Sequence, residues 1–138
     1  MATRRIPHDT GIAAIPASST MRAGWIVSGL VILFLLVDGI MKVLRMDVSV
    51  EATVEFGYPE SQVAWIGFAL LICTLLYAMP RTAILGSILL TGYLGGAIAT
   101  QVRIEEPAFL FAALIGVLAW VGLAMRDDRT RALFRAPS

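Results

Sequence analysis

Two residues of opposite charge lie four positions apart inside an otherwise apolar segment. Asp38 and Lys42 are separated by one helical turn, so their side chains would meet on one face of a helix. Ionisable groups in an apolar span are costly and usually face a bundle interior or a wet cavity. One interpretation is a neutral pair that fixes helix packing, with Lys42 reaching toward the interface. The other is a site for a polar substrate, a quinone head group or a proton.

A second polar face follows later in the chain. Tyr93, Thr100 and Gln101 are seven and eight residues apart, which places them on one side of a helix. A phenol in the middle of an apolar span needs a polar partner. We expect this face to meet Asp38 and Lys42 in a polar ligand-binding pocket that opens away from the cytoplasm. No residue of the five can be assigned a catalytic role.

The same segment contains a pair of glycines four residues apart. Gly92 and Gly96 form a GxxxG unit, which lets a neighbouring helix approach closely in a membrane. We therefore predict that these two glycines serve helix packing.

Several kinds of chemistry are missing from the sequence. His8 is the only histidine and Cys73 the only cysteine, so we expect no metal site, no haem and no disulfide. We expect no intrinsic cofactor, although hydrogen bonds in the pocket could hold a quinone. The sequence contains no basic block with interleaved aromatic residues, so we expect no nucleic-acid partner. The chain is therefore not expected to be an enzyme on its own.

The elements that position these residues follow from hydropathy. The sequence is 58% hydrophobic and 15% charged, with a mean hydropathy of +0.80, whereas soluble domains carry about 25% charged residues. Stretches of about 20 apolar residues cross a bilayer as helices. Four segments have this length: 23–44, 61–80, 82–102 and 107–125. The sequence predicts an all-α transmembrane four-helix bundle in the lipid bilayer.

The distribution of basic residues predicts the orientation. Eight of the eleven Lys and Arg residues fall in the two tails and the turn at Arg81, which should therefore face the cytoplasm. Residues 1–22 are expected to be a disordered cytoplasmic tail and 127–138 a second cytoplasmic tail. The connection 45–60 lies on the far side, where the spacing of its valines and glutamates permits a short interfacial helix.

Particular stretches of the sequence resemble a known family. The runs LFLLVDGIMKVLR, VEATVEFGYPES and CTLLYAMPRTAILGSILLTGYLGGAIATQVR are similar to the DoxX-like family of small bacterial membrane proteins. The resemblance covers about residues 24–126 and implies a four-helix bundle in the bacterial cytoplasmic (inner) membrane. Members have been linked to a thiosulfate:quinone oxidoreductase and to oxidative-stress complexes. Similar sequences often carry histidine where this chain has Gln101, which cannot take up a proton.

Three functions are compatible with these features. The first is the membrane subunit of a quinone-linked redox or oxidative-stress complex, in which a soluble oxidoreductase partner supplies the electrons. The second is a small transporter or a lipid- or small-molecule-binding protein. Four helices are few for alternating access, so transport would require a homo-oligomer. The third is a structural or assembly factor without a ligand.

Overall fold

The computed structural model describes residues 17–135, which are helical apart from short connections and contain no strand. Four helices are long and apolar enough to cross a membrane: α1 (Ala17–Val43), α3 (Val63–Ala78) with the preceding 3-10 turn η1 (Glu60–Gln62), α4 (Ala83–Arg103) and α5 (Phe109–Arg126). Two short helices, α2 (Asp47–Glu55) and α6 (Asp128–Phe134), lie outside these spans. The prediction of an all-α bundle with four spans is confirmed.

The ends of the chain differ from the predicted tails. Helix α1 begins at Ala17, so residues 17–22 continue the first span and are not disordered as predicted. The rest of the predicted N-terminal tail, residues 1–16, lies outside the described residues. At the other end, residues 128–134 form α6, which the sequence did not indicate. Residues 136–138 are also outside the described part.

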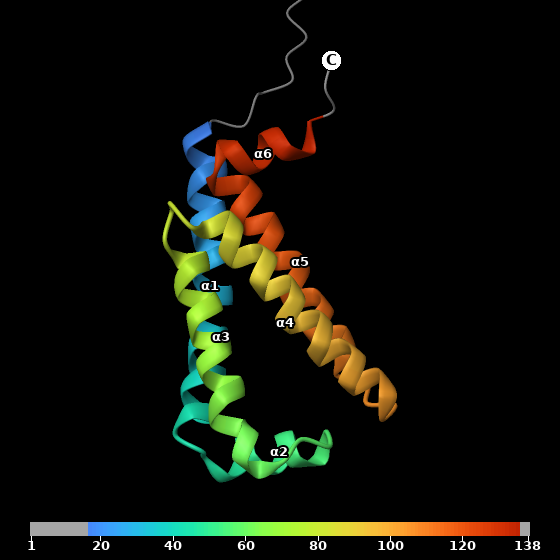
Figure 1. The fold of residues 1–138 in the computed structure, drawn as a ribbon. Coiled ribbons are helices and arrows are strands. Elements are labelled where there is room, and N and C mark those ends of the chain that lie inside the picture. Colours follow the sequence, from blue (N-terminus) through green and yellow to red (C-terminus); the bar gives the residue numbers. More distant parts are fainter. Residues whose placement is uncertain (1–16, 136–138) are drawn as a thin grey trace, which may run out of the picture.

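The four long helices form a ring in which each packs against two others. Helix α1 contacts α3 and α5, and α4 contacts the same two helices, so α1 and α4 lie diagonally opposite each other. Figure 1 shows that α4 and α5 separate from α1 and α3 toward the end that carries α2. The bundle is therefore a wedge, closed at the end of α6 and open toward α2.

Glycines allow the close approach at the closed end. A Cβ atom on Gly86 of α4 would lie 2.6 Å from the carbonyl carbon of Leu76, and closer still to the backbone of Tyr77. A Cβ on Gly24 of α1 would lie 2.7 Å from the backbone nitrogen of Arg126. Real Cβ atoms do not approach other atoms this closely, so only glycine permits these contacts.

Buried polar groups join three helices at this closed end. The hydroxyl of Tyr77, which is fully buried, donates to the carbonyl of Ala119 at 2.7 Å and lies 3.1 Å from the Ser28 hydroxyl. Arg126 donates to the carbonyl of Tyr77 at 2.7 Å, and its guanidinium stacks over the ring of Trp25 at 4.4 Å. Hydrogen bonds between helices stabilise bundles in lipid, so this network holds α1, α3 and α5 together.

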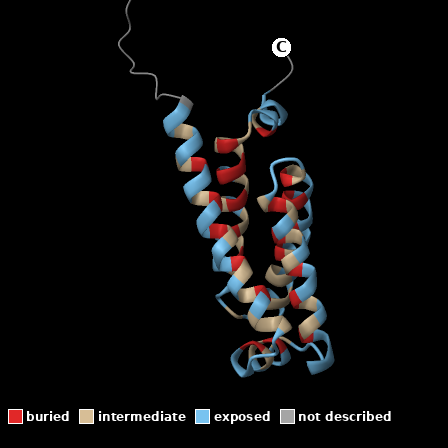
Figure 2. Ribbon diagram, turned by 90° about the vertical axis from the view of Figure 1, so that its left-hand side faces the viewer, coloured by how far each residue is buried: buried red, intermediate tan, exposed pale blue. Residues whose placement is uncertain are grey.

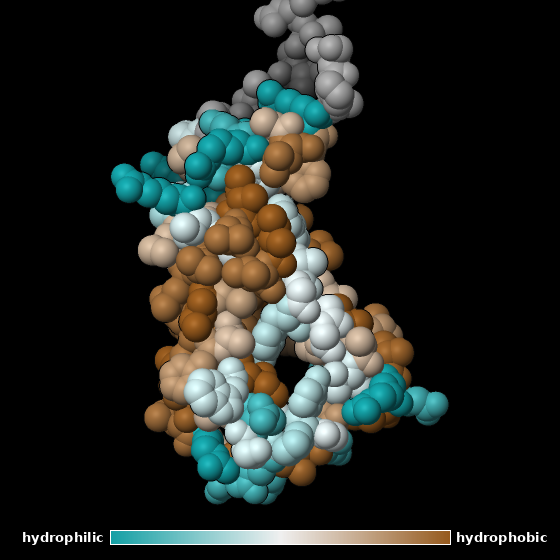
Figure 3. All heavy atoms as spheres, viewed as in Figure 1, coloured by the Kyte–Doolittle hydropathy of each residue, from teal (hydrophilic) through white to brown (hydrophobic). Residues whose placement is uncertain are grey.

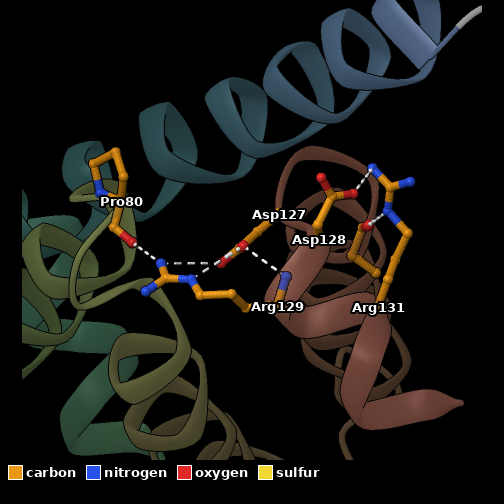
Figure 4. A network of polar contacts seen from close by, with 6 residues as sticks. Pro80, Asp127, Asp128, Arg129 and Arg131 are labelled. Atoms are coloured by element: carbon orange, nitrogen blue, oxygen red, sulfur yellow. Dashed lines mark hydrogen bonds and ion pairs between the residues drawn. The ribbon is translucent and has the colours of Figure 1, made fainter.

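Helix α6 lies across the closed end and is fixed by polar contacts (Figure 4). Asp127 caps its first turn by accepting from the backbone N–H of Arg129 at 3.0 Å. The Arg129 guanidinium donates to the carbonyl of Pro80 at 2.7 Å, which ties α6 to the turn between α3 and α4. Arg131 pairs with Asp128 at 3.1 Å. The short helix thus braces the end where the spans are closest.

The outward faces of the spans are apolar. Figure 2 shows that exposed residues cover the outer sides of the helices while buried residues point inward. Many of the exposed residues are large and hydrophobic: Ile26, Leu30, Leu33, Trp65, Phe68, Ile72, Leu110, Leu114 and Val117. An apolar exterior of this extent suits lipid and not water. The chain is a multi-pass membrane protein.

Candidate ligand pocket

The wedge between the helices contains a cavity of about 570 Å³. Its side walls come from α1, α3, α4 and α5, and α2 with the following loop lies across its wide end. Small-molecule sites in proteins commonly have volumes of about 300–1,000 Å³, apolar walls and a few convergent polar groups. The cavity has this character, since most of its lining is aliphatic, aromatic or glycine.

The five residues predicted to form a polar pocket all line this one cavity: Asp38, Lys42, Tyr93, Thr100 and Gln101. They come from α1 and α4, which are diagonal in the ring, so the two groups face each other across the cavity and not through direct helix contact. Asp38 and Lys42 form an ion pair with each other, as their spacing predicts. Their side chains remain 35% and 16% exposed, which leaves both open to an occupant of the cavity.

Gln101 has the clearest unsatisfied hydrogen-bonding capacity in the cavity. Its side-chain oxygen Oε1 is buried and has no hydrogen-bond partner among residues 17–135. A buried acceptor without a partner loses its hydration and gains nothing in return. Gln101 lines the cavity, so a rotation of its side chain would bring this oxygen within reach of a hydrogen-bond donor on an occupant.

The contribution of α2 was missed from the sequence. Ser49 and Thr53 are buried, line the cavity and lie four residues apart on the inner side of this short helix. Glu51 and Glu55 are exposed, as expected for an interfacial helix. The four-residue spacing of Ser49 and Thr53 places them on one face of a helix, but the sequence does not indicate what that face contacts. The structure shows that this face lines the cavity.

The loop after α2 contacts the end of α4. The hydroxyl of Tyr58 lies 3.0 Å from that of Thr100, and Arg103 donates to the carbonyl of Phe56 at 2.8 Å. Gly57, at a φ of 93°, permits this turn. These contacts bridge the two sides of the wedge at its wide end. The wide end of the wedge is thus largely covered, and Figure 3 shows a gap above α2, between α3 and α4.

The predicted packing role of Gly92 and Gly96 is wrong within this chain. A Cβ on either residue would meet no atom within 4 Å, and both residues border the cavity. The GxxxG spacing marks a smooth surface, but the divergence of α4 from α3 leaves it without a neighbouring helix. The close contacts between helices occur at other glycines, such as Gly86 and Gly122.

The described residues offer no group of three or more His, Cys, Asp or Glu side chains that could hold a metal ion. Cys73 is a free thiol, half-buried against the core. The chemistry that the cavity itself offers is binding: hydrogen bonds, an ion pair and apolar contact.

The family of the chain follows from comparison with known proteins. No curated protein and no solved structure matches it. The family model described as the DoxX-like family matches residues 26–122, which include all four spans in whole or in large part and the cavity. The chain belongs to the DoxX-like family.

Proposed function

We propose that this chain binds a lipid-soluble molecule with a small polar head group, and that a quinone is the ligand. The observation that carries the proposal is the cavity of about 570 Å³, with apolar walls and polar side chains from α1, α2 and α4 converging on it. Quinone carbonyl groups accept hydrogen bonds, which Lys42 and Tyr93 can donate, whereas the Thr100 hydroxyl already donates to the Gly96 carbonyl at 2.9 Å. The hydroquinone form has hydroxyl groups that can donate to Gln101 Oε1.

In this proposal the chain is the membrane subunit of a redox or oxidative-stress complex and not a complete enzyme. The ligand would carry the electrons, and the protein would supply binding and orientation. A soluble oxidoreductase would reduce or oxidise the bound quinone from the outer face of the bacterial inner membrane, which is the side nearer the cavity.

The orientation belongs to the same proposal. The start of α1, the turn between α3 and α4, and α6 lie at one end of the bundle (Figure 1). That end carries Arg22, Arg81, Arg126, Arg129, Arg131 and Arg135. Because basic residues accumulate on the cytoplasmic side of membrane proteins, we place both termini in the cytoplasm. The cavity then lies in the outer half of the membrane.

The test is direct titration of the purified full-length protein, in mild detergent, with decylubiquinone and a short-chain menaquinone analogue, each in its oxidised form and in its reduced hydroquinone form. Gln101→Leu removes one hydrogen-bonding group, worth about 1 kcal/mol, and should weaken binding of the hydroquinone about fivefold. Gln62→Leu is the matched control, because Gln62 is exposed and lies outside the cavity. Saturable binding that weakens only in the first variant supports the proposal. No saturable binding of either quinone would refute it.

A second candidate is a lipid- or small-molecule-binding protein without a redox partner. It is favoured by the gap between α3 and α4, because a cavity open to the side is accessible to molecules dissolved in the membrane (Figure 3). Extraction of the purified protein with organic solvent and mass spectrometry separates the two candidates. A stoichiometric lipid without quinone would select the second.

A further inference from the structure

We propose that the cavity is filled from the bilayer, through a lateral portal between α3 and α4, by an uncharged amphiphile whose hydrocarbon chain passes through that portal. The portal is defined by Gly92 and Gly96 on α4 and by Ile66 and Ala69 on α3, all of which line the cavity. The inference uses the same cavity as the proposed function, but it stands whether or not the occupant is a quinone.

The first argument is the divergence of the α3–α4 hairpin. Near the turn, a Cβ on Gly86 would collide with the backbone of α3, with the Leu76 carbonyl carbon 2.6 Å away. Six residues further along α4, a Cβ on Gly92 would meet nothing within 4 Å, and the same holds at Gly96. The two helices are therefore in backbone contact at one end and apart at the other. The absence of side chains at these two glycines widens the gap further.

The second argument is that the other sides of the wedge carry contacts that cross them. On the side between α1 and α5, the rings of Phe34 and Phe111 pack edge to face with centroids 5.2 Å apart. At the wide end, the Tyr58 hydroxyl lies 3.0 Å from that of Thr100. Between 63–72 of α3 and 92–103 of α4 there is no hydrogen bond or aromatic pair in the described structure.

The third argument is depth in the membrane. At about 1.5 Å of rise per residue, Gly96 lies about 10 Å and Gly92 about 16 Å along α4 from Arg103 at its end. Half of a hydrocarbon core is about 15 Å thick. The portal therefore opens within the hydrocarbon and extends from one leaflet to about the midplane of the bilayer. Neighbouring outward side chains, such as Phe68 and Ile72, are exposed and apolar, as expected for contact with acyl chains.

The polar groups of the cavity define the head group of the occupant. Asp38 and Lys42 neutralise each other, so they favour neither an anionic nor a cationic head group. Gln101 lines the cavity, and its Oε1 has no partner in residues 17–135; a head group with a hydroxyl or N–H donor would pair with this oxygen once the side chain rotates toward the cavity. An uncharged amphiphile places such a head group between α1 and α4, while its chain extends past Gly92 and Gly96 into the lipid.

The experiment uses the full-length protein in phosphatidylcholine vesicles with a photoreactive probe, hexadecanol carrying a diazirine in the middle of its chain. After irradiation, peptide mass spectrometry locates the adducts. We expect adducts on α3 and α4 peptides that flank the portal. The portal variant, Gly92→Leu with Gly96→Leu, should lose this labelling. The Cβ atom of each leucine fits, because no atom lies within 4 Å of either Cβ position.

A matched control separates the portal from a general effect of added leucines. Gly95→Leu with Gly29→Leu also introduces two leucines where a Cβ meets nothing within 4 Å, and neither glycine lines the cavity. Gly95 lies on the same helix as the portal glycines. The control should retain the labelling seen in the unmodified protein. Equal labelling of all three proteins, or equal loss in both variants, would overturn the proposal.

A second probe distinguishes a blocked portal from a filled cavity. Butanol carrying a diazirine has no long chain to accommodate between the helices, so its labelling of the cavity should persist in the portal variant. Loss of both probes would show that the leucines fill the cavity and would overturn the portal assignment. The quinone titration is independent: if quinones fail to bind while hexadecanol follows the expected pattern, the redox proposal falls and the portal stands.

Discussion

Substitution by alanine at two glycines of α4 should have different effects on the free energy of unfolding. In Gly86→Ala the new methyl group would lie 2.6 Å from the Leu76 carbonyl carbon and closer still to the Tyr77 backbone. These atoms belong to the backbone, so no side-chain rotation relieves the collision and α4 must move away from α3. Overpacking of this kind costs about 1–3 kcal/mol. We therefore expect Gly86→Ala to lower the free energy of unfolding by at least about 1–3 kcal/mol.

Gly92→Ala should have the reverse effect. Its new methyl group would meet no atom within 4 Å, so nothing has to move. Alanine is favoured over glycine within a helix by about 0.8–1 kcal/mol, although lipid contact and the cavity can reduce this gain. We therefore expect a free energy of unfolding that is unchanged or higher by as much as about 1 kcal/mol.

The assay is reversible unfolding in mixed micelles of dodecylmaltoside and sodium dodecyl sulfate, followed by far-ultraviolet circular dichroism. If Gly86→Ala fails to fold while Gly92→Ala folds normally, Gly86→Ala is still the less stable of the two variants, as expected. The reasoning is refuted if Gly92→Ala destabilises the protein as much as Gly86→Ala. That result would show that the GxxxG pair makes a helix contact, either in a different arrangement of the bundle or between two copies of the chain.

Four further predictions concern the closed end and the topology. Tyr77→Phe removes the hydroxyl that donates to the Ala119 carbonyl at 2.7 Å and should lower the free energy of unfolding by about 0.6–1.7 kcal/mol in the same assay. Arg126→Ala removes the contacts of a residue that is only 7% exposed and should destabilise the protein by about 2 kcal/mol or more, because a charge-assisted hydrogen bond and a cation–π contact are both lost. The exposed Arg129→Ala should cost less than about 1 kcal/mol. Fusions after Arg135 should fluoresce with green fluorescent protein and lack activity with alkaline phosphatase; the opposite pattern would reverse our orientation.

The four spans and the five pocket residues were accessible from the sequence. Spans are set locally, because a helix must satisfy its own backbone hydrogen bonds in lipid and needs about 20 apolar residues to cross it. The pocket residues followed from helical periodicity combined with depth. Asp38 and Lys42 lie in the half of the first span that is nearer α2, and Thr100 and Gln101 lie in the last quarter of α4, toward the same end of the bundle. Polar side chains that lie at the same depth in a membrane tend to face the same bundle interior.

The choice of packing glycines, the course of α2 and the side on which the cavity opens depended on tertiary structure. Gly86 and Gly92 are both glycines of α4, yet only Gly86 contacts another backbone. The difference comes from the divergence of α4 from α3, and α4 is held by contacts distant in sequence, such as the hydrogen bond that Trp120 of α5 donates to the Thr91 hydroxyl at 2.8 Å. Local sequence determines that a helix forms and which face is polar. Only the packed bundle determines what that face meets, because the crossing angles result from side chains of several helices together.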